Sequence, residues 1–190
     1  MMENTSIMIV GVGGQGTLLA SRILGNTLIG AGYDVKVSEV HGMSQRGGSV
    51  TTYVRFGEKV WSPIIEKGGA DIILSFELLE ALRALPYLKP DGQIIVNTQQ
   101  IDPMPVITGA AEYPQGIAEL LEKQSKLTAV DALALAREAG SIKAVNVVLI
   151  GLLAKRTAIP RAQWEDTIRT TVPPKFLDIN LKAFALGYEY

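Results

Sequence analysis

Two glycine-rich segments contain the groups of this sequence that could hold a ligand. In the first, residues 11–16 (GVGGQG), the glycines match the G-x-G-x-x-G spacing of dinucleotide-binding loops. Glycine permits a tight turn and a close approach of the backbone to phosphate, and the amides that open a following helix favour an anion. The residues that we predict to bind a nucleotide-type cofactor are Gly11, Gly13, Gly14, Gln15, Gly16 and Glu39.

Glu39 belongs to this set because it follows the loop by about 20 residues, where dinucleotide sites carry an acid for a ribose hydroxyl. The alternative for the whole motif is architectural, since glycines also let a strand and a helix pack closely. The pattern leaves both interpretations open.

The second segment, residues 41–48 (HGMSQRGG), combines hydrogen-bonding side chains with glycines. An arginine can clamp a carboxylate or phosphate with two parallel hydrogen bonds, so the loop suits a polar or anionic substrate, or a partner protein. The alternative is a surface loop whose polar groups only cap the backbone. We predict no metal site, because no second histidine or cysteine accompanies the histidine, and we assign no catalytic residue. The residues of this substrate or partner loop are His41, Ser44, Gln45, Arg46, Gly47 and Gly48.

The elements around both loops predict a βαβ unit. Residues 7–10 form a strand, 16–31 a helix with apolar residues on one side, and 34–39 a second strand. Such strands run parallel with a right-handed crossover. Because both loops follow strands, they should meet at the carboxyl edge of the sheet, where open α/β folds bind ligands.

The remaining pattern extends this unit. Further strands are predicted at 49–56, 71–76, 93–97 and 127–130, with a hairpin partner near 59–61, a turn at 90–92, and an irregular stretch at 101–116 that includes an edge strand. Asn97 ends a strand and is a candidate rim residue. Glu77 follows a strand and could face the crevice, although an acid there more often favours a helix N-terminus. The fold class is α/β: a Rossmann-like three-layer sheet with a β-hairpin insertion and a C-terminal helical segment at about 142–190. We predict a single domain, 1–190.

Composition narrows the function classes. The chain has 18 basic and 19 acidic residues, which gives no reason to expect nucleic acid or acidic lipid as a partner. It has no cysteine, which excludes cysteine-held zinc and iron–sulfur clusters within the chain. We expect no membrane span and no signal peptide, and therefore a cytoplasmic protein. The mean hydropathy of +0.22 suggests that some apolar surface lies at a subunit interface.

Taken together, the two loop regions resemble a known family. The stretches IMIVGVGGQGTLLASRIL and EVHGMSQRGGSVTTYVRFG resemble the gamma-type domain of 2-oxoacid:ferredoxin oxidoreductases, and the second is most similar to the beta subunit of the indolepyruvate-specific branch. The later stretches DIILSFELLEALRALPYLKPDGQIIVN and NVVLIG are similar as well. The resemblance spans nearly the whole chain.

The resemblance implies a subunit for the CoA-dependent oxidative decarboxylation of an aryl 2-oxoacid such as indolepyruvate, in anaerobic amino-acid catabolism. The products would be an acyl-CoA, carbon dioxide and reduced ferredoxin. Thiamine diphosphate, magnesium and iron–sulfur clusters would lie on a larger partner subunit, so this chain would hold no cofactor and would be inactive alone. Its glycine-rich loops would hold a CoA phosphate or contact the partner. Two alternatives stay open: a free-standing NAD(P)-dependent oxidoreductase, and a nucleotide- or CoA-binding module.

Overall fold

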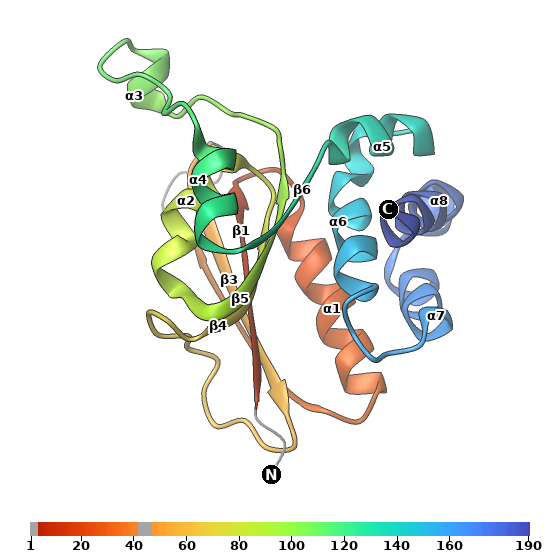
Figure 1. The fold of residues 1–190 in the computed structure, drawn as a ribbon. Helices are drawn as coiled ribbons and strands as arrows, with labels where there is room; N and C mark the ends of the chain where they lie inside the picture. Colours follow the sequence, from red (N-terminus) through yellow and green to blue (C-terminus); the bar gives the residue numbers. More distant parts are fainter. Residues whose placement is uncertain (1–3, 42–46) are drawn as a thin grey trace.

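A six-stranded sheet forms the centre of the protein, and helices cover both of its faces (Figure 1). The computed structural model describes residues 4–41 and 47–190. The strands are β1 Thr5–Val12, β2 Asp34–His41, β3 Ser49–Gly57, β4 Ala70–Ser75, β5 Leu88–Asn97 and β6 Lys126–Val130. The α-helices are α1 Thr17–Gly30, α2 Leu78–Ala84, α3 Met104–Ile107, α4 Ile117–Gln124, α5 Ala132–Ala139, α6 Val145–Ala154, α7 Arg161–Thr171 and α8 Leu177–Glu189.

The strand order is β2-β3-β1-β4-β5-β6. β1, β4, β5 and β6 pair in parallel, as expected of βαβ units. β1 and β2 point the same way, as predicted, but they are not neighbours, because β3 lies between them and pairs antiparallel with both. The connection from β2 to β3 is too short for a parallel crossover, so these two strands must pair antiparallel.

The predicted hairpin between residues 49–56 and 59–61 was wrong, because residues 59–61 form no strand. β3 instead pairs antiparallel with the preceding strand, β2. Side chains hold the segment after β3 instead: the Val60 N–H donates to Asp34 Oδ2 at 2.9 Å, and Arg55 donates to the carbonyls of Ser62 and Ile64 at 3.0 and 3.2 Å. β3 ends at Gly57, and the chain does not turn there into a second strand.

Two further local predictions are corrected. The sequence Pro90-Asp91-Gly92 is not a turn but part of β5, where an irregularity in the pairing with β4 accommodates it. The predicted edge strand within residues 101–116, all of which are described, is absent, and the stretch carries the short helix α3 instead. The sequence pattern had not indicated α4, whose Ile117 and Leu121 lie one turn apart and are buried.

The larger core lies on the face covered by α1 and α6, with α5, α7 and α8 packed behind them (Figure 1). Every residue of α6 is buried, as expected for an apolar helix that is enclosed by its neighbours. α6 and α8 cross at two glycines: a Cβ on Gly187 would lie 2.0 Å from the Val148 carbonyl, and one on Gly151 would lie 2.3 Å from that of Phe184. The predicted helical segment is thus packed onto the sheet.

A smaller core lies on the opposite face, beneath α2 and α4. There the inward residues of β1, β4 and β5, such as Met8, Ile73 and Ile94, meet Leu79 and Leu121. Across the described ranges, none of the helices has both the length and the apolar character to cross a membrane.

Candidate functional site

The first glycine-rich loop joins β1 to α1 at the carboxyl edge of the sheet, and the second segment ends against it. The Gly13 N–H donates to the Gly48 carbonyl at 2.8 Å, and the Gly47 N–H donates to the Gly13 carbonyl at 3.4 Å. The predicted meeting of the two loops is therefore confirmed at Gly47 and Gly48. The side chain of His41, and Ser44, Gln45 and Arg46, lie outside the described residues.

Gln15 acts as an internal clamp of the first loop. Its Oε1 accepts a hydrogen bond from the Val12 N–H at 2.7 Å, and its Nε2 donates to the Phe76 carbonyl at 3.0 Å, which ties the loop to the end of β4. A Cβ on Gly11 would lie 2.9 Å from both Gln15 Oε1 and Phe76 Cβ. Gly11 and Gln15 thus build the loop and do not line its cleft.

Gly16 fixes the start of α1. It adopts a left-handed conformation with φ of +83°, and a Cβ there would lie 2.7 Å from Asn146 Nδ2. This amide donates to the Gly16 carbonyl at 3.2 Å, so a side chain of α6 supports the loop from behind. Sequence reasoning had not assigned Asn146 a role. The signal available was a polar residue inside the apolar run of α6.

An open cleft of about 430 Å³ lies in front of this loop. Thr17 and Leu18 open α1, and their N–H groups find no acceptor in residues 4–41 and 47–190, as is usual in the first turn of a helix. Glu39 also lines this cleft, so the structure brings it to the loop as predicted. The lining residues are Gly13, Gly14, Gly16, Thr17, Leu18, Glu39 and Val50.

This cleft offers three kinds of contact. The amides at the start of α1 can donate to a phosphate or carbonyl, the Glu39 carboxylate can accept from a hydroxyl or amine, and Leu18 and Val50 supply apolar surface. A dinucleotide pyrophosphate needs the amides of the glycine loop itself, but that of Gly13 is already bound to Gly48. The cleft therefore fits a nicotinamide dinucleotide poorly. Among the described residues, no group of three or more histidine, aspartate or glutamate side chains is placed to hold a metal ion.

Behind the cleft, the turn between β4 and α2 connects several segments. The Phe76 carbonyl accepts from Gln15 Nε2 and also from Asn97 Nδ2 at 3.1 Å. The Oδ1 of Asn97 in turn accepts from the Ala132 N–H at 3.1 Å. Asn97 is fully buried, so the prediction that it lies at the rim was wrong. Its amide joins β4 to the start of α5.

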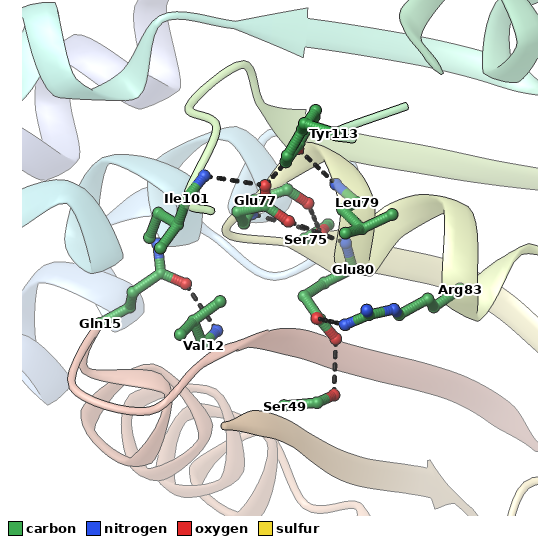
Figure 2. A network of polar contacts seen from close by, with 10 residues as sticks. All are labelled: Val12, Gln15, Ser49, Ser75, Glu77, Leu79, Glu80, Arg83, Ile101 and Tyr113. Atoms are coloured by element: carbon green, nitrogen blue, oxygen red, sulfur yellow. Dashed lines mark hydrogen bonds and ion pairs between the residues drawn. The ribbon is translucent and has the colours of Figure 1, made fainter. Parts of the chain in front are cut away.

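Two glutamates follow this turn (Figure 2). Glu77 caps α2, with its Oε2 accepting from the Glu80 N–H at 2.9 Å, which is the helix N-terminal role that the sequence favoured. Glu80 reaches back to the sheet: its Oε2 accepts from the hydroxyl of Ser49 at 2.5 Å, and its Oε1 accepts from Arg83 at 2.6 Å. Glu80 therefore fixes the first residue of β3, next to the second glycine-rich segment.

Tyr113 completes this network. Its hydroxyl donates to Glu77 Oε1 and accepts from the Leu79 N–H at 3.2 Å (Figure 2). Burial, followed by the hydrogen bond to the Glu77 carboxylate, raises the pKa of Tyr113 well above its usual range. The phenol consequently stays protonated and remains a donor throughout the neutral range.

Comparison with known proteins identifies the family of this chain. The family model described as pyruvate ferredoxin/flavodoxin oxidoreductase matches residues 6–190. The chain belongs to this family. The resemblance predicted from residues 7–24 and 39–57 is thereby confirmed, and with it the functional class of a 2-oxoacid oxidoreductase subunit.

Individual proteins match over nearly the full length of the chain. The indolepyruvate oxidoreductase subunit IorB of Thermococcus kodakarensis is 48% identical over 192 residues, which cover 98% of this chain and 95% of that protein. The crystal structure of the gamma subunit of a keto/oxoacid ferredoxin oxidoreductase from Geobacter sulfurreducens has a TM-score of 0.73 at 23% identity, and covers 97% of this chain and 96% of that one. This structural likeness confirms the predicted α/β fold.

The same fold also occurs inside a longer chain. In the 2-oxoglutarate:ferredoxin oxidoreductase of Magnetococcus marinus, solved with 2-oxoglutarate, CoA and succinyl-CoA bound, the match has a TM-score of 0.71 at 16% identity. It covers 100% of this chain but 31% of that one. The fold thus occurs both in chains of similar length and as one part of a longer polypeptide.

Proposed function

We propose that this chain is the small subunit of an indolepyruvate:ferredoxin oxidoreductase, acting as one unit over residues 1–190. The assembled enzyme would convert an aryl 2-oxoacid and CoA to an acyl-CoA and carbon dioxide, and would pass the electrons to ferredoxin in the cytoplasm. The observation that carries this proposal is the full-length match, at 48% identity, to a protein named as an indolepyruvate oxidoreductase subunit.

The resemblance to 2-oxoacid:ferredoxin oxidoreductases implies a division of labour, in which the clusters, thiamine diphosphate and magnesium would belong to a larger partner subunit and would supply the decarboxylation and the electron transfer. The composition agrees for the clusters, because a sequence without cysteine cannot ligate them through thiolates. This chain contributes a rigid edge of a sheet, with a cleft whose groups can bind and orient but not oxidise.

We assign that cleft to CoA. A phosphate of CoA can accept from the amides of Thr17 and Leu18, which have no acceptor among the described residues, and a hydroxyl or amine of the same molecule can donate to Glu39. Leu18, with 58% of its surface exposed, and Val50 can contact the apolar parts of the ligand. In this role the chain would hold the acyl acceptor, and thiamine diphosphate on the partner would supply the decarboxylation chemistry.

The test is an anaerobic purification of the tagged chain from the organism that encodes it. We expect a brown, thiamine-containing partner in fixed stoichiometry, and CoA-dependent reduction of ferredoxin or a viologen dye by indolepyruvate. Pyruvate and 2-oxoglutarate serve as substrate controls. Turnover by the isolated chain, or recovery of the chain with no partner, would overturn the proposal.

The cleft assignment needs a separate control within the assembled complex. Glu39→Gln should raise the KM for CoA while the KM for indolepyruvate stays unchanged, because the carboxylate is assigned to CoA alone. The exposed Glu119, on the opposite side of the sheet, provides the matched variant Glu119→Gln, for which both constants should stay at wild-type values. Equal changes in both KM values for Glu39→Gln would contradict the assignment.

A further inference from the structure

An exposed arm leaves the sheet between β5 and α4. The chain passes β5, rises through residues 98–103, forms the short helix α3 and returns to α4 at Ile117. Figure 1 shows this arm projecting from the body of the protein, at the end of the sheet where the parallel strands terminate. The glycine-rich loop follows β1 at that same end, so the arm and the cleft share one edge.

The two ends of the arm, at Ile101 and Tyr113, which we call its feet, are hydrogen-bonded to a single buried carboxylate oxygen. The Ile101 N–H donates to Glu77 Oε1 at 3.1 Å, and the Tyr113 hydroxyl donates to the same oxygen (Figure 2). Glu77 is 1% exposed and Tyr113 is 8% exposed. A buried carboxylate needs several donors to offset its lost hydration, so these hydrogen bonds must form together, and the two feet are fixed side by side.

The tip of the arm is also ordered from within. The N–H groups of Ala110 and Ala111 both donate to the Pro105 carbonyl, at 2.8 and 3.0 Å, and the Thr108 N–H donates to the Met104 carbonyl at 2.9 Å. Val106 turns inward against the smaller core. The arm is therefore preformed, and little conformational entropy would be lost if its tip were bound by another molecule.

The surface of the tip is apolar and uncharged. Residues 103–111 (PMPVITGAA) contain no charged side chain. Met104 and Ile107 are 65% and 66% exposed. Large apolar side chains on a rigid protrusion are the kind of anchor that protein interfaces use.

Acidic residues flank the tip on both sides. Asp102 and Glu112 are exposed and stand directly before and after the uncharged stretch. Two such arms from two copies of this chain would bring four carboxylates together, which disfavours pairing of arm with arm. A groove with an apolar floor and a basic rim would complement both the tip and its flanks.

We propose that residues 102–112 form a docking arm, whose Met104 and Ile107 insert into an apolar, basic-rimmed groove on the larger subunit of the complex. Glu77 and Tyr113 are its positioning residues. The inference rests on the proposed function, since it takes the larger subunit as the occupant. It adds a specific contact: an anchor at the same sheet edge as the cleft, so that docking the arm also brings the cleft to the partner.

The test measures the dissociation constant of the full chain for the larger subunit, by titrating one into the other under anaerobic conditions. Native mass spectrometry checks the stoichiometry of the complex. The double variant Met104→Glu/Ile107→Glu should raise the dissociation constant about 30-fold or more, because two anchors lose their apolar contact. Met104→Leu/Ile107→Leu keeps that contact and should bind within about threefold of wild type. Ile142→Glu, an equally exposed aliphatic position outside the arm, is the control for added charge and should also bind like wild type.

The outcomes separate the two proposals. If the wild-type chain binds no larger subunit, the proposed function fails. If the wild type binds and the tip variant binds equally well with an unchanged circular dichroism melt, the arm is not the anchor. A wild-type homodimer that becomes monomeric in the tip variant would make a second copy the occupant and would overturn the present assignment.

Discussion

The edge of the sheet that carries the candidate site holds two carboxylates in opposite situations. Glu77 is 1% exposed, and its two oxygens accept from Glu80, Ile101 and Tyr113. Glu39 is partly buried and lines an open cleft beside the first turn of α1. The former is surrounded by groups of its own chain, whereas the latter also faces space that a ligand can enter.

This difference distinguishes a carboxylate that stabilises the fold from one that can bind a ligand. A buried carboxylate bound to neutral donors joins segments that are distant in sequence, and removing it leaves several donors unsatisfied at once. A carboxylate that lines an open cleft can also be reached by a ligand from the cleft side. Substitutions should therefore change stability most at Glu77 and binding most at Glu39.

The largest effect is expected for Glu77→Leu. The substitution leaves the Tyr113 hydroxyl and the N–H groups of Ile101 and Glu80 without their acceptor, and should lower the free energy of unfolding by about 3 kcal/mol. Chemical denaturation followed by circular dichroism measures this loss. Glu119→Leu, at an exposed first-turn acid of α4, is the matched control and should change stability by less than about 0.5 kcal/mol. Similar losses for the two variants would remove the distinction.

A smaller effect is expected for Gly16→Ala, at the support of the cleft itself. The new Cβ would combine an unfavourable positive φ with a contact 2.7 Å from Asn146 Nδ2. We expect a loss of about 2 kcal/mol. Gly32→Ala isolates the backbone strain, because Gly32 has a similar φ of +87° and open space around it. Equal losses in the two variants would show that the Asn146 side chain moves away from the new Cβ with no loss of unfolding free energy.

The Tyr113 hydroxyl predicts a dependence on alkaline pH. Its pKa is raised in the folded state by burial and by Glu77, whereas an unfolded tyrosine ionises near pH 10. The stabilisation from its hydrogen bonds should be fully present below about pH 10 and should fall as the pH rises further, because only the unfolded state releases the proton. The difference in unfolding free energy between wild type and Tyr113→Phe, measured from pH 8 to 11, should shrink. A constant difference would contradict the role of the hydroxyl.

The smallest effect on stability, and the largest on binding, is expected for Glu39→Gln. The unfolding free energy should change by less than about 1 kcal/mol, because glutamine keeps the size of the side chain and one acceptor oxygen. Loss of a charged acceptor for a CoA hydroxyl or amine should raise the KM for CoA about 10-fold in the assembled enzyme. Steady-state kinetics at saturating indolepyruvate measures this change. A wild-type KM would place the ligand elsewhere.

Local signals predicted much of the architecture. The apolar runs of β1, β4, β5 and β6, and the helical spacing of α1, identified their elements because each signal lies within one segment. The insertion of β3 between β1 and β2 was missed, since strand order depends on which strands hydrogen-bond to each other, and the pattern within one segment does not specify this. The turn signal at residues 90–92 failed because an irregularity within β5 absorbs it.

The site divides in the same way. Glycine spacing and Glu39 predicted the cleft, because that motif needs its residues at fixed distances along the chain. The clamp of Gln15 on Phe76, the support from Asn146 and the bonding of Gly13 to Gly48 were not predictable, since each joins groups from different elements. The last of these changed the interpretation of the motif, because it occupies an amide that a dinucleotide would need.

The sequence by itself determined the family, the α/β class and the absence of thiolate chemistry, because these depend on residue types and on spacing along the chain. The tertiary structure alone decided which glutamate is enclosed and which lines a cleft, and that the two feet of the arm meet at one oxygen. The physical reason is that burial and hydrogen bonding depend on neighbours distant in the chain. From the sequence, Glu77 and Glu39 both lie at the predicted carboxyl ends of strands, and only the packed molecule shows that one is enclosed and the other lines a cleft.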